Sequence, residues 1–75
     1  MKLSKAKINT KCVIKSVCVK NEKIKFRLME LGLVENCQLI VFKKSVLKKT
    51  LLIDFAHSRF TLKENLANEI EVEYA

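Results

Sequence analysis

Hydrophobic residues recur at helical spacing between Asn21 and Leu31. Positions three or four residues apart share one face of a helix, so this pattern predicts a short helix with one side to bury. We expect the helix to span Asn21–Leu31 and the other elements to pack on it. Its apolar positions are Ile24, Phe26, Leu28, Met29 and Leu31.

The ends of this helix carry recognisable signals. Asn21 can accept a hydrogen bond from a first-turn amide, and Glu22 complements the positive end of the helix dipole. Gly32 is the only glycine in the chain, and it lies where the periodic pattern stops. A helix exit often needs a positive φ, which glycine adopts without a Cβ clash. Gly32 is therefore predicted to have a structural role.

Alternating or continuous apolar runs elsewhere predict five strands. The first has a slipped alternation between Ile14 and Val17, which indicates a bulge or a strong twist. The second has apolar residues on both faces and is expected to be buried on both sides, after a left-handed turn at Asn36. The predicted strands are Lys11–Lys20, Cys37–Lys43, Leu51–Phe55, Ser58–Leu62 and Ile70–Tyr74.

The segments between the strands are short and polar. Lys43–Lys49 is expected to form an exposed hairpin tip in which Val46 and Leu47 act as an apolar latch. Ala56-His57 is predicted to form a tight turn without glycine, and Leu62–Ala67 to form one helical turn. The basic segment Lys2–Thr10 is expected at the domain edge or frayed.

This order of elements indicates a mainly-β fold, a small SH3-like β-barrel with one short helix after the first strand and a helical turn before the last. Closing a short sheet on itself removes edges that few residues could otherwise cover. The 75 residues make one domain, 1–75.

The composition bounds location and partners. Fifteen Lys and Arg against eight Asp and Glu give a formal charge of +7, which steers a protein to acidic partners. No apolar run approaches the ~20 residues that cross a bilayer, and the basic N-terminus has no apolar segment typical of a secretory signal. We expect a cytoplasmic protein without membrane insertion.

The residues with reactive side chains do not form a known motif. Cys12, Cys18 and Cys37 lack a Cys-x-x-Cys pair and are expected to be reduced core residues, with His57 a surface turn residue. Cys12 and Cys18 lie too far apart along one strand to chelate a single ion. No glycine-rich phosphate loop is present. We therefore predict no enzyme activity, metal site or cofactor.

The ordered motifs resemble a known family. Arg27–Leu33 reads Arg-Leu-Met-Glu-Leu-Gly-Leu, similar to the Arg-Leu-x-x-Leu-Gly signature of the FeoA family, ferrous iron transport protein A. The later strands continue the likeness over roughly residues 11–74, through Gln38–Phe42, Leu51–Ile53, Ser58–Ala67 and Ile70–Val72. The chain departs from the family pattern at three turns, which are Glu35-Asn36, Ser45–Leu47 and His57.

The resemblance implies a cytosolic, non-enzymatic accessory of bacterial ferrous iron uptake. Its implied partner is FeoB, a membrane transporter with a cytosolic GTP-binding domain. The helix has more apolar residues than one stripe needs and the hairpin tip is charged, so we expect both to contact the partner. The candidate contact residues are Arg27, Met29, Glu30, Leu33, Lys44 and Lys48.

Two alternatives and the oligomeric state stay open at this point. Small basic barrels bind nucleic acid by stacking bases on aromatic rings. Most aromatics here fall at inward positions, so no nucleic acid is expected as a partner. The aromatics are Phe26, Phe42, Phe55, Phe60 and Tyr74. FeoA-like domains also occur fused to metal-dependent repressors, which allows a metal-sensing regulatory role. Weak homo-oligomers are compatible with either role.

Overall fold

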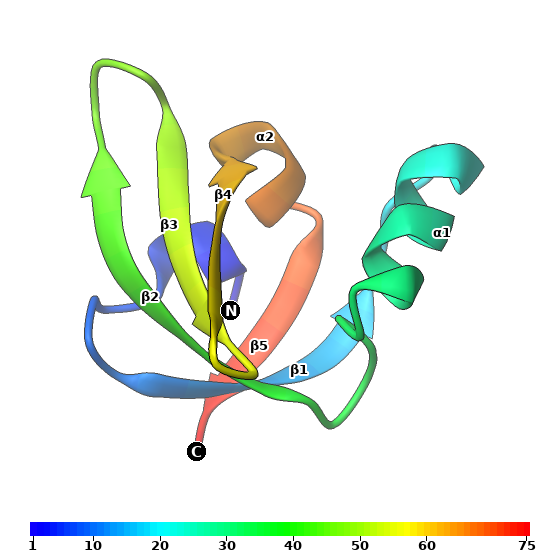
Figure 1. Cartoon of the computed structure of the whole chain (residues 1–75), viewed down its shortest axis with the longest axis horizontal. Coiled ribbons are helices and arrows are strands. Elements are labelled where there is room, and N and C mark those ends of the chain that lie inside the picture. Colours follow the sequence, from blue (N-terminus) through cyan, green and yellow to red (C-terminus); the bar gives the residue numbers. More distant parts are fainter.

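The computed structural model describes residues 1–75 and contains a single antiparallel sheet of five strands in the order β4-β3-β2-β1-β5. Figure 1 shows the sheet curving around a core, with a helix to one side. The predicted mainly-β class and the predicted order of elements are confirmed. The elements are η1 (Leu3–Lys5), β1 (Lys11–Val17), α1 (Glu22–Glu30), β2 (Gln38–Ser45), β3 (Thr50–Phe55), β4 (Ser58–Lys63), α2 (Glu64–Ala67) and β5 (Ile70–Tyr74).

The core lies inside the curve of the sheet and consists of hydrophobic side chains only. Alternate strand positions supply most of it, as a pleated strand with one buried face requires. Ile40 and Phe42 on the other face of β2 are only half-buried, so the prediction of a strand buried on both sides is wrong. The buried strand residues are Cys12, Ile14, Leu39, Val41, Leu51, Ile53, Leu62, Ile70 and Val72.

Two register shifts bend the sheet. The pairing of β1 with β5 shifts between Ile14 and Ser16, which confirms the irregularity predicted from the slipped alternation. The pairing of β2 with β3 shifts between Val41 and Lys43. An extra residue on one strand increases the local twist. These shifts therefore help a short sheet to wrap around its core.

The N-terminal segment is docked onto the domain, so of the two expectations for it, edge or frayed, the frayed one is wrong. Leu3 and Ala6 are fully buried, and η1 packs against α2 and β5. Lys2 forms a β-bridge with Glu71, and Ser4 hydrogen-bonds the side chain of Asn68. Two apolar side chains among lysines are a weak sequence signal, although both belong to the buried core.

Several turns use left-handed residues other than glycine. The Ala56-His57 turn between β3 and β4 has φ values of 50° and 66°, typical of a tight hairpin turn that favours Asn-Gly. Asn36 has a φ of 73°, which confirms the predicted left-handed turn, and Asn9 and Lys49 also have positive φ.

The β2–β3 hairpin ends in a four-residue loop, Val46–Lys49, closed by the Ser45–Thr50 pair. We call this loop the hairpin tip. It projects beyond the rest of the sheet at the upper left of Figure 1. Val46 is 87% and Leu47 97% exposed, so the tip is exposed as predicted. The predicted apolar latch is wrong, because neither side chain packs against the core.

Candidate docking surface

The capping of α1 follows the sequence signals. The Asn21 side-chain oxygen accepts hydrogen bonds from the amides of Lys23 and Ile24, at 3.0 and 3.2 Å. Glu22 lies in the first turn. Asn21 and Leu31 are the cap residues, so the helix is one residue shorter at each end than predicted.

Gly32 ends the helix as predicted, with a φ of 90°. The Gly32 amide donates to the Met29 carbonyl at 2.9 Å, and the Leu33 amide donates to the Leu28 carbonyl at 2.9 Å. This pair of bonds is the Schellman motif, and the accompanying apolar contact is available from the buried Leu28 and Leu33 side chains. A Cβ at Gly32 would lie 3.3 Å from Cε2 of Phe55.

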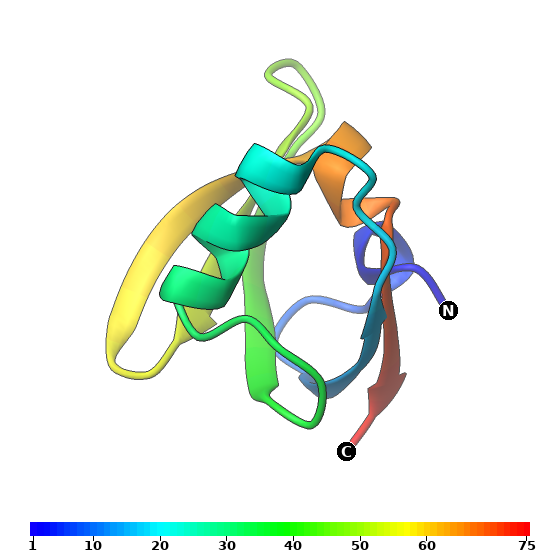
Figure 2. The same cartoon turned by 90° about the vertical axis from the view of Figure 1, so that its right-hand side faces the viewer.

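The helix contributes little to the core, which corrects the expectation that the other elements pack on it. Leu28 is the one buried residue of α1. Figure 2 shows the helix lying beside the mouth of the curved sheet, not inside it. Phe26 is 61% and Met29 55% exposed, and the remaining apolar positions Ile24 and Leu31 are exposed as well. A nine-residue helix with one buried side chain therefore presents most of its apolar surface to solvent.

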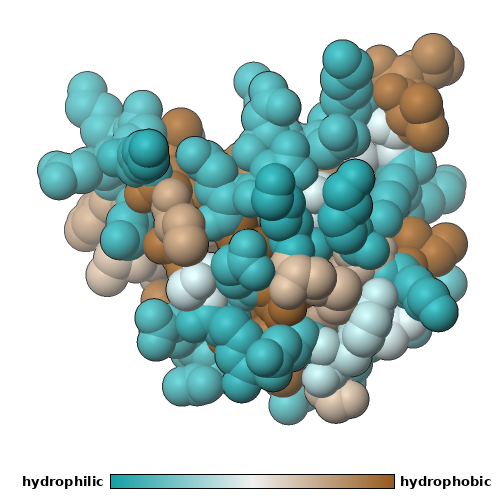
Figure 3. Space-filling model, turned by 180° about the vertical axis from the view of Figure 1, so that it is seen from behind, coloured by the Kyte–Doolittle hydropathy of each residue, from teal (hydrophilic) through white to brown (hydrophobic).

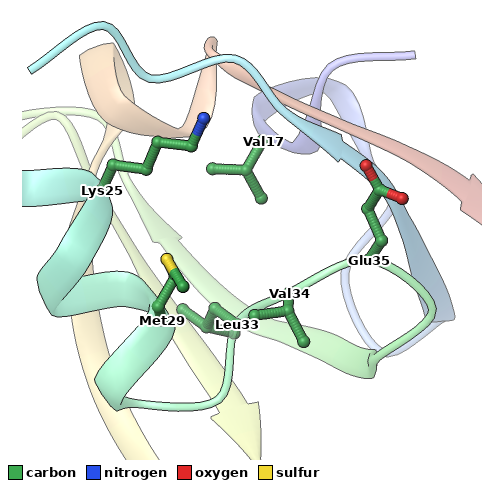
Figure 4. A pocket seen from close by; sticks show the side chains of 6 residues that line it. All are labelled: Val17, Lys25, Met29, Leu33, Val34 and Glu35. Atoms are coloured by element: carbon green, nitrogen blue, oxygen red, sulfur yellow. The ribbon is translucent and has the colours of Figure 1, made fainter. Parts of the chain in front are cut away.

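An open hollow of about 190 Å³ lies between α1, the helix exit and the end of β1. Figure 4 shows Lys25 and Met29 entering it from the helix, with Glu35 at the far rim. Val17, Leu33 and Val34 provide its apolar lining. Phe26 and Met29 are three residues apart and thus neighbours on the helix surface. We call Phe26, Met29, Val34 and the hollow the docking surface.

The predicted contact residues fall in three different places. Met29 is on the docking surface, and Glu30 lies beside it, four residues from Phe26. Arg27 lies on the other flank of α1, around a second hollow with Ile24. Leu33 lines the same hollow as Met29 but is only 1% exposed, so it offers little of its own surface to a partner.

Lys44 and Lys48 belong to a separate surface. They line a hollow of about 350 Å³ on the β2–β3 hairpin, on the opposite side of the molecule from α1 in Figure 1. Lys44 Nζ donates to the Ser4 carbonyl at 3.0 Å. The six predicted contacts therefore do not form one patch.

The three cysteines differ in environment. Cys12 is buried, and this burial raises the pKa of its thiol above the ordinary value of 9.0. Cys37 is half-buried and donates to the Gly32 carbonyl at 2.9 Å, which ties the residue before β2 to the helix exit. Cys18 is exposed, so its prediction as a core residue is wrong.

No group of three or more His, Cys, Asp or Glu side chains gathers where a metal ion could be held. His57 is exposed in its turn, as predicted. No helix has the length and apolar character needed to cross a bilayer.

The aromatic side chains are divided between core and surface. Phe55 and Phe60 pack against the core, while Phe42 lies under the Arg59 guanidinium at 4.0 Å from its ring centre. The inward position predicted for Tyr74 is wrong, because this residue is 43% exposed and its hydroxyl accepts from the Lys7 amide at 3.0 Å. Sequence reasoning did not single out Phe26 as a contact. In the structure Phe26 is 61% exposed and is the largest apolar side chain on the docking surface.

Residues 1–74 of the chain match the FeoA domain family. The chain belongs to this family. The match confirms the resemblance and extends it to the N-terminal residues that the motifs did not cover. FeoA-family proteins take part in ferrous iron transport, and the family's SH3-like fold agrees with the predicted barrel.

Solved structures support the same assignment. The FeoA protein of Chlorobium tepidum is 30% identical with a TM-score of 0.88, and the match covers 99% of this chain and 70% of that one. The FeoA of Stenotrophomonas maltophilia, a prokaryotic SH3 domain protein solved in complex with zinc, is 32% identical with a TM-score of 0.82. That match covers 97% of this chain and 89% of the other.

The fold also occurs within longer chains. The metal-dependent transcriptional regulator MtsR shares it with a TM-score of 0.80 at 17% identity, over 96% of this chain and 35% of that one. At this identity the likeness concerns the fold alone. No curated protein matches the chain closely enough to count as a relative.

Proposed function

We propose that this FeoA-family protein is a cytosolic, non-enzymatic accessory of bacterial ferrous iron uptake that binds the cytosolic GTP-binding domain of FeoB. The observation that carries the proposal is the exposed apolar surface of α1 and its exit. Only one leucine of α1 is buried in the core, so its other apolar side chains are available to a partner.

The residue types on the docking surface are those that interface centres favour. Aromatic residues and Met are enriched at the buried core of interfaces, where a few anchors supply most of the affinity. Phe26 and Met29 offer such anchors side by side, and both are more than half exposed in the free protein. Burying them against a partner removes apolar area from water that the fold leaves exposed.

The hollow beside these anchors can fix the orientation in which a partner binds. Its apolar lining accepts a partner side chain, while Lys25 on one rim and Glu35 on the other can pair with opposite charges. Rim charges of both signs fix the orientation of a partner more than they raise affinity. We therefore expect one bound orientation on FeoB.

The test measures binding of the purified FeoB cytosolic domain by calorimetry. Met29→Glu places a charge at the centre of the docking surface, so we expect at least about a ten-fold loss of affinity. Val46→Glu is the matched control, because it makes the same kind of change at an exposed apolar residue of the hairpin tip. The proposed contact is limited to the docking surface and leaves out the hairpin lysines, which line a separate hollow, so the control is expected to bind as the wild type does.

Circular dichroism establishes that both variants are folded. Unchanged binding by a folded Met29→Glu protein would rule out α1 as the contact surface. Loss of concentration-dependent self-association in that variant, with FeoB binding intact, would instead assign the docking surface to a second copy of the chain.

A further inference from the structure

We propose that the hairpin tip binds the surface of an anionic lipid bilayer, with Val46 and Leu47 inserted at the level of the headgroups and the neighbouring lysines paired with lipid phosphates. This inference goes beyond the proposed function and does not depend on it. For this one loop it replaces the expectation of a protein without membrane insertion. It concerns a surface on a different side of the molecule from α1 (Figure 1).

The first observation is the exposure of two adjacent aliphatic residues at the far end of a hairpin. Val46 is 87% and Leu47 97% exposed, and neither belongs to the core or packs against it. Figure 3 shows the apolar tip as a projection at the upper right of the molecule, beyond mostly hydrophilic atoms. A projecting apolar tip can enter the headgroup region without any rearrangement of the barrel.

The second observation is the charge around this tip. Lysines 43, 44, 48 and 49 flank the two aliphatic residues, and the hairpin between Lys43 and Thr50 has no acidic residue. Glu64 is an acidic residue that contacts the hairpin tip, and it does so through its backbone amide, which donates to the Lys49 carbonyl at 2.9 Å. Clustered lysines are attracted to anionic lipid, and their flexible stems let the ammonium groups reach phosphates while the chain beside them enters the interface.

The combination favours a bilayer over nucleic acid. Proteins that bind single strands stack bases on aromatic rings, and the hairpin tip contains none. Aliphatic side chains flanked by cations match the layered chemistry of an anionic bilayer, which is charged at the phosphates and apolar just below them. The hollow lined by Lys43, Lys44 and Lys48 adds hydroxyl groups from Ser45, Thr50 and Thr61, which can donate to phosphate oxygens.

The experiment measures co-sedimentation with vesicles of phosphatidylcholine, with or without phosphatidylglycerol. We expect binding only to the anionic vesicles and a steep loss of binding as salt is raised. Each lysine near an anionic surface contributes about five-fold in affinity, so Lys43→Gln with Lys48→Gln should weaken binding about 25-fold. Lys20→Gln with Lys23→Gln is the matched control, since it removes the same charge from exposed residues near α1.

Insertion of the tip can be measured by tryptophan fluorescence. The chain contains no tryptophan, so a single introduced one reports on its own position. In a Leu47→Trp variant, tryptophan emission should shift to the blue when anionic vesicles are added. The emission of a Phe26→Trp variant, labelled on α1, should not change. A Val46→Ser, Leu47→Ser double variant should lose vesicle binding even though its lysines are intact.

Four results would overturn the proposal. These are no binding of the wild type to anionic vesicles at low salt, equal losses for the hairpin and control lysine pairs, no emission shift for Leu47→Trp, and full binding by the serine double variant. Tighter binding to a single-stranded oligonucleotide through the same lysines would assign the hairpin to nucleic acid instead. Since the vesicles contain no protein, none of these results bears on FeoB binding.

Discussion

Replacement of Gly32 by alanine tests how the helix exit holds α1 in place. Gly32 has a φ of 90°, in the left-handed region that residues with a Cβ adopt with difficulty. The added Cβ would also lie 3.3 Å from Cε2 of Phe55, which is closer than ordinary van der Waals contact. The substitution therefore strains the backbone at residue 32 and also presses the new Cβ against the half-buried Phe55 ring.

The expected cost follows from these two effects. A left-handed conformation costs an ordinary residue about 1–2 kcal/mol. A ring displaced from its rotamer adds about 0.5–1.5 kcal/mol, and alanine recovers about 0.4–1 kcal/mol by restricting the unfolded chain. We expect Gly32→Ala to lower the free energy of unfolding by about 2 kcal/mol, which corresponds to a melting temperature roughly 8–16 °C lower for a domain of this size.

Urea unfolding followed by circular dichroism measures this loss. Gly32→Asn is the informative control, because it carries the same Cβ against Phe55 but tolerates the left-handed region better than alanine does. Asparagine should therefore be the less destabilising of the two. If Gly32→Ala unfolds within about 0.5 kcal/mol of the wild type, the ordinary range for surface substitutions, then the exit does not need glycine and the reasoning is refuted.

Three further changes probe the helix and the core. Leu28→Ala removes the one buried side chain of α1 and should cost about 2–5 kcal/mol in urea unfolding, whereas Phe26→Ala, at an exposed position, should cost less than about 0.5 kcal/mol. Asn21→Ala removes the acceptor of two amide hydrogen bonds and should cost about 1 kcal/mol in the same assay, and Asn21→Asp should restore most of it. Burial raises the pKa of the Cys12 thiol above 9.0, so the unfolded thiol ionises first and the unfolding free energy should fall as pH rises past that value. A Cys12→Ala protein should lack this part of the pH dependence, and an identical slope in both proteins would contradict the assignment.

Local conformation was predictable because it depends on residues close in sequence. The residue type alone favours the local backbone geometry at three positions. Glycine and asparagine allow the positive φ at Gly32 and Asn36, and the Asn21 side chain caps the helix. The irregularity after Ile14 was predictable because a strand whose apolar alternation slips must gain an extra residue to keep both parts facing the core. These features required no knowledge of what packs against them.

Burial of whole faces was not predictable in the same way. The spacing of Ile24, Leu28 and Leu31 shows that they lie near one another, but not that another element covers them. The strands supply most of the core and α1 contributes only Leu28, so the helix is left largely exposed. The candidate contacts were chosen for their proximity to Gly32 in the sequence. Helical spacing instead places Arg27 beside Ile24, on a different flank from Phe26 and Met29.

The left-handed turns have a consequence for engineering this protein. Ala56 and His57 both adopt positive φ without being glycine, so the fold tolerates strain there that a better turn sequence would relieve. Substituting Asn-Gly at this site offers a stabilised background, and the turn lies on neither the docking surface nor the hairpin tip. Charge-altering variants of those two surfaces could then be compared in a scaffold that withstands the loss of stability they bring.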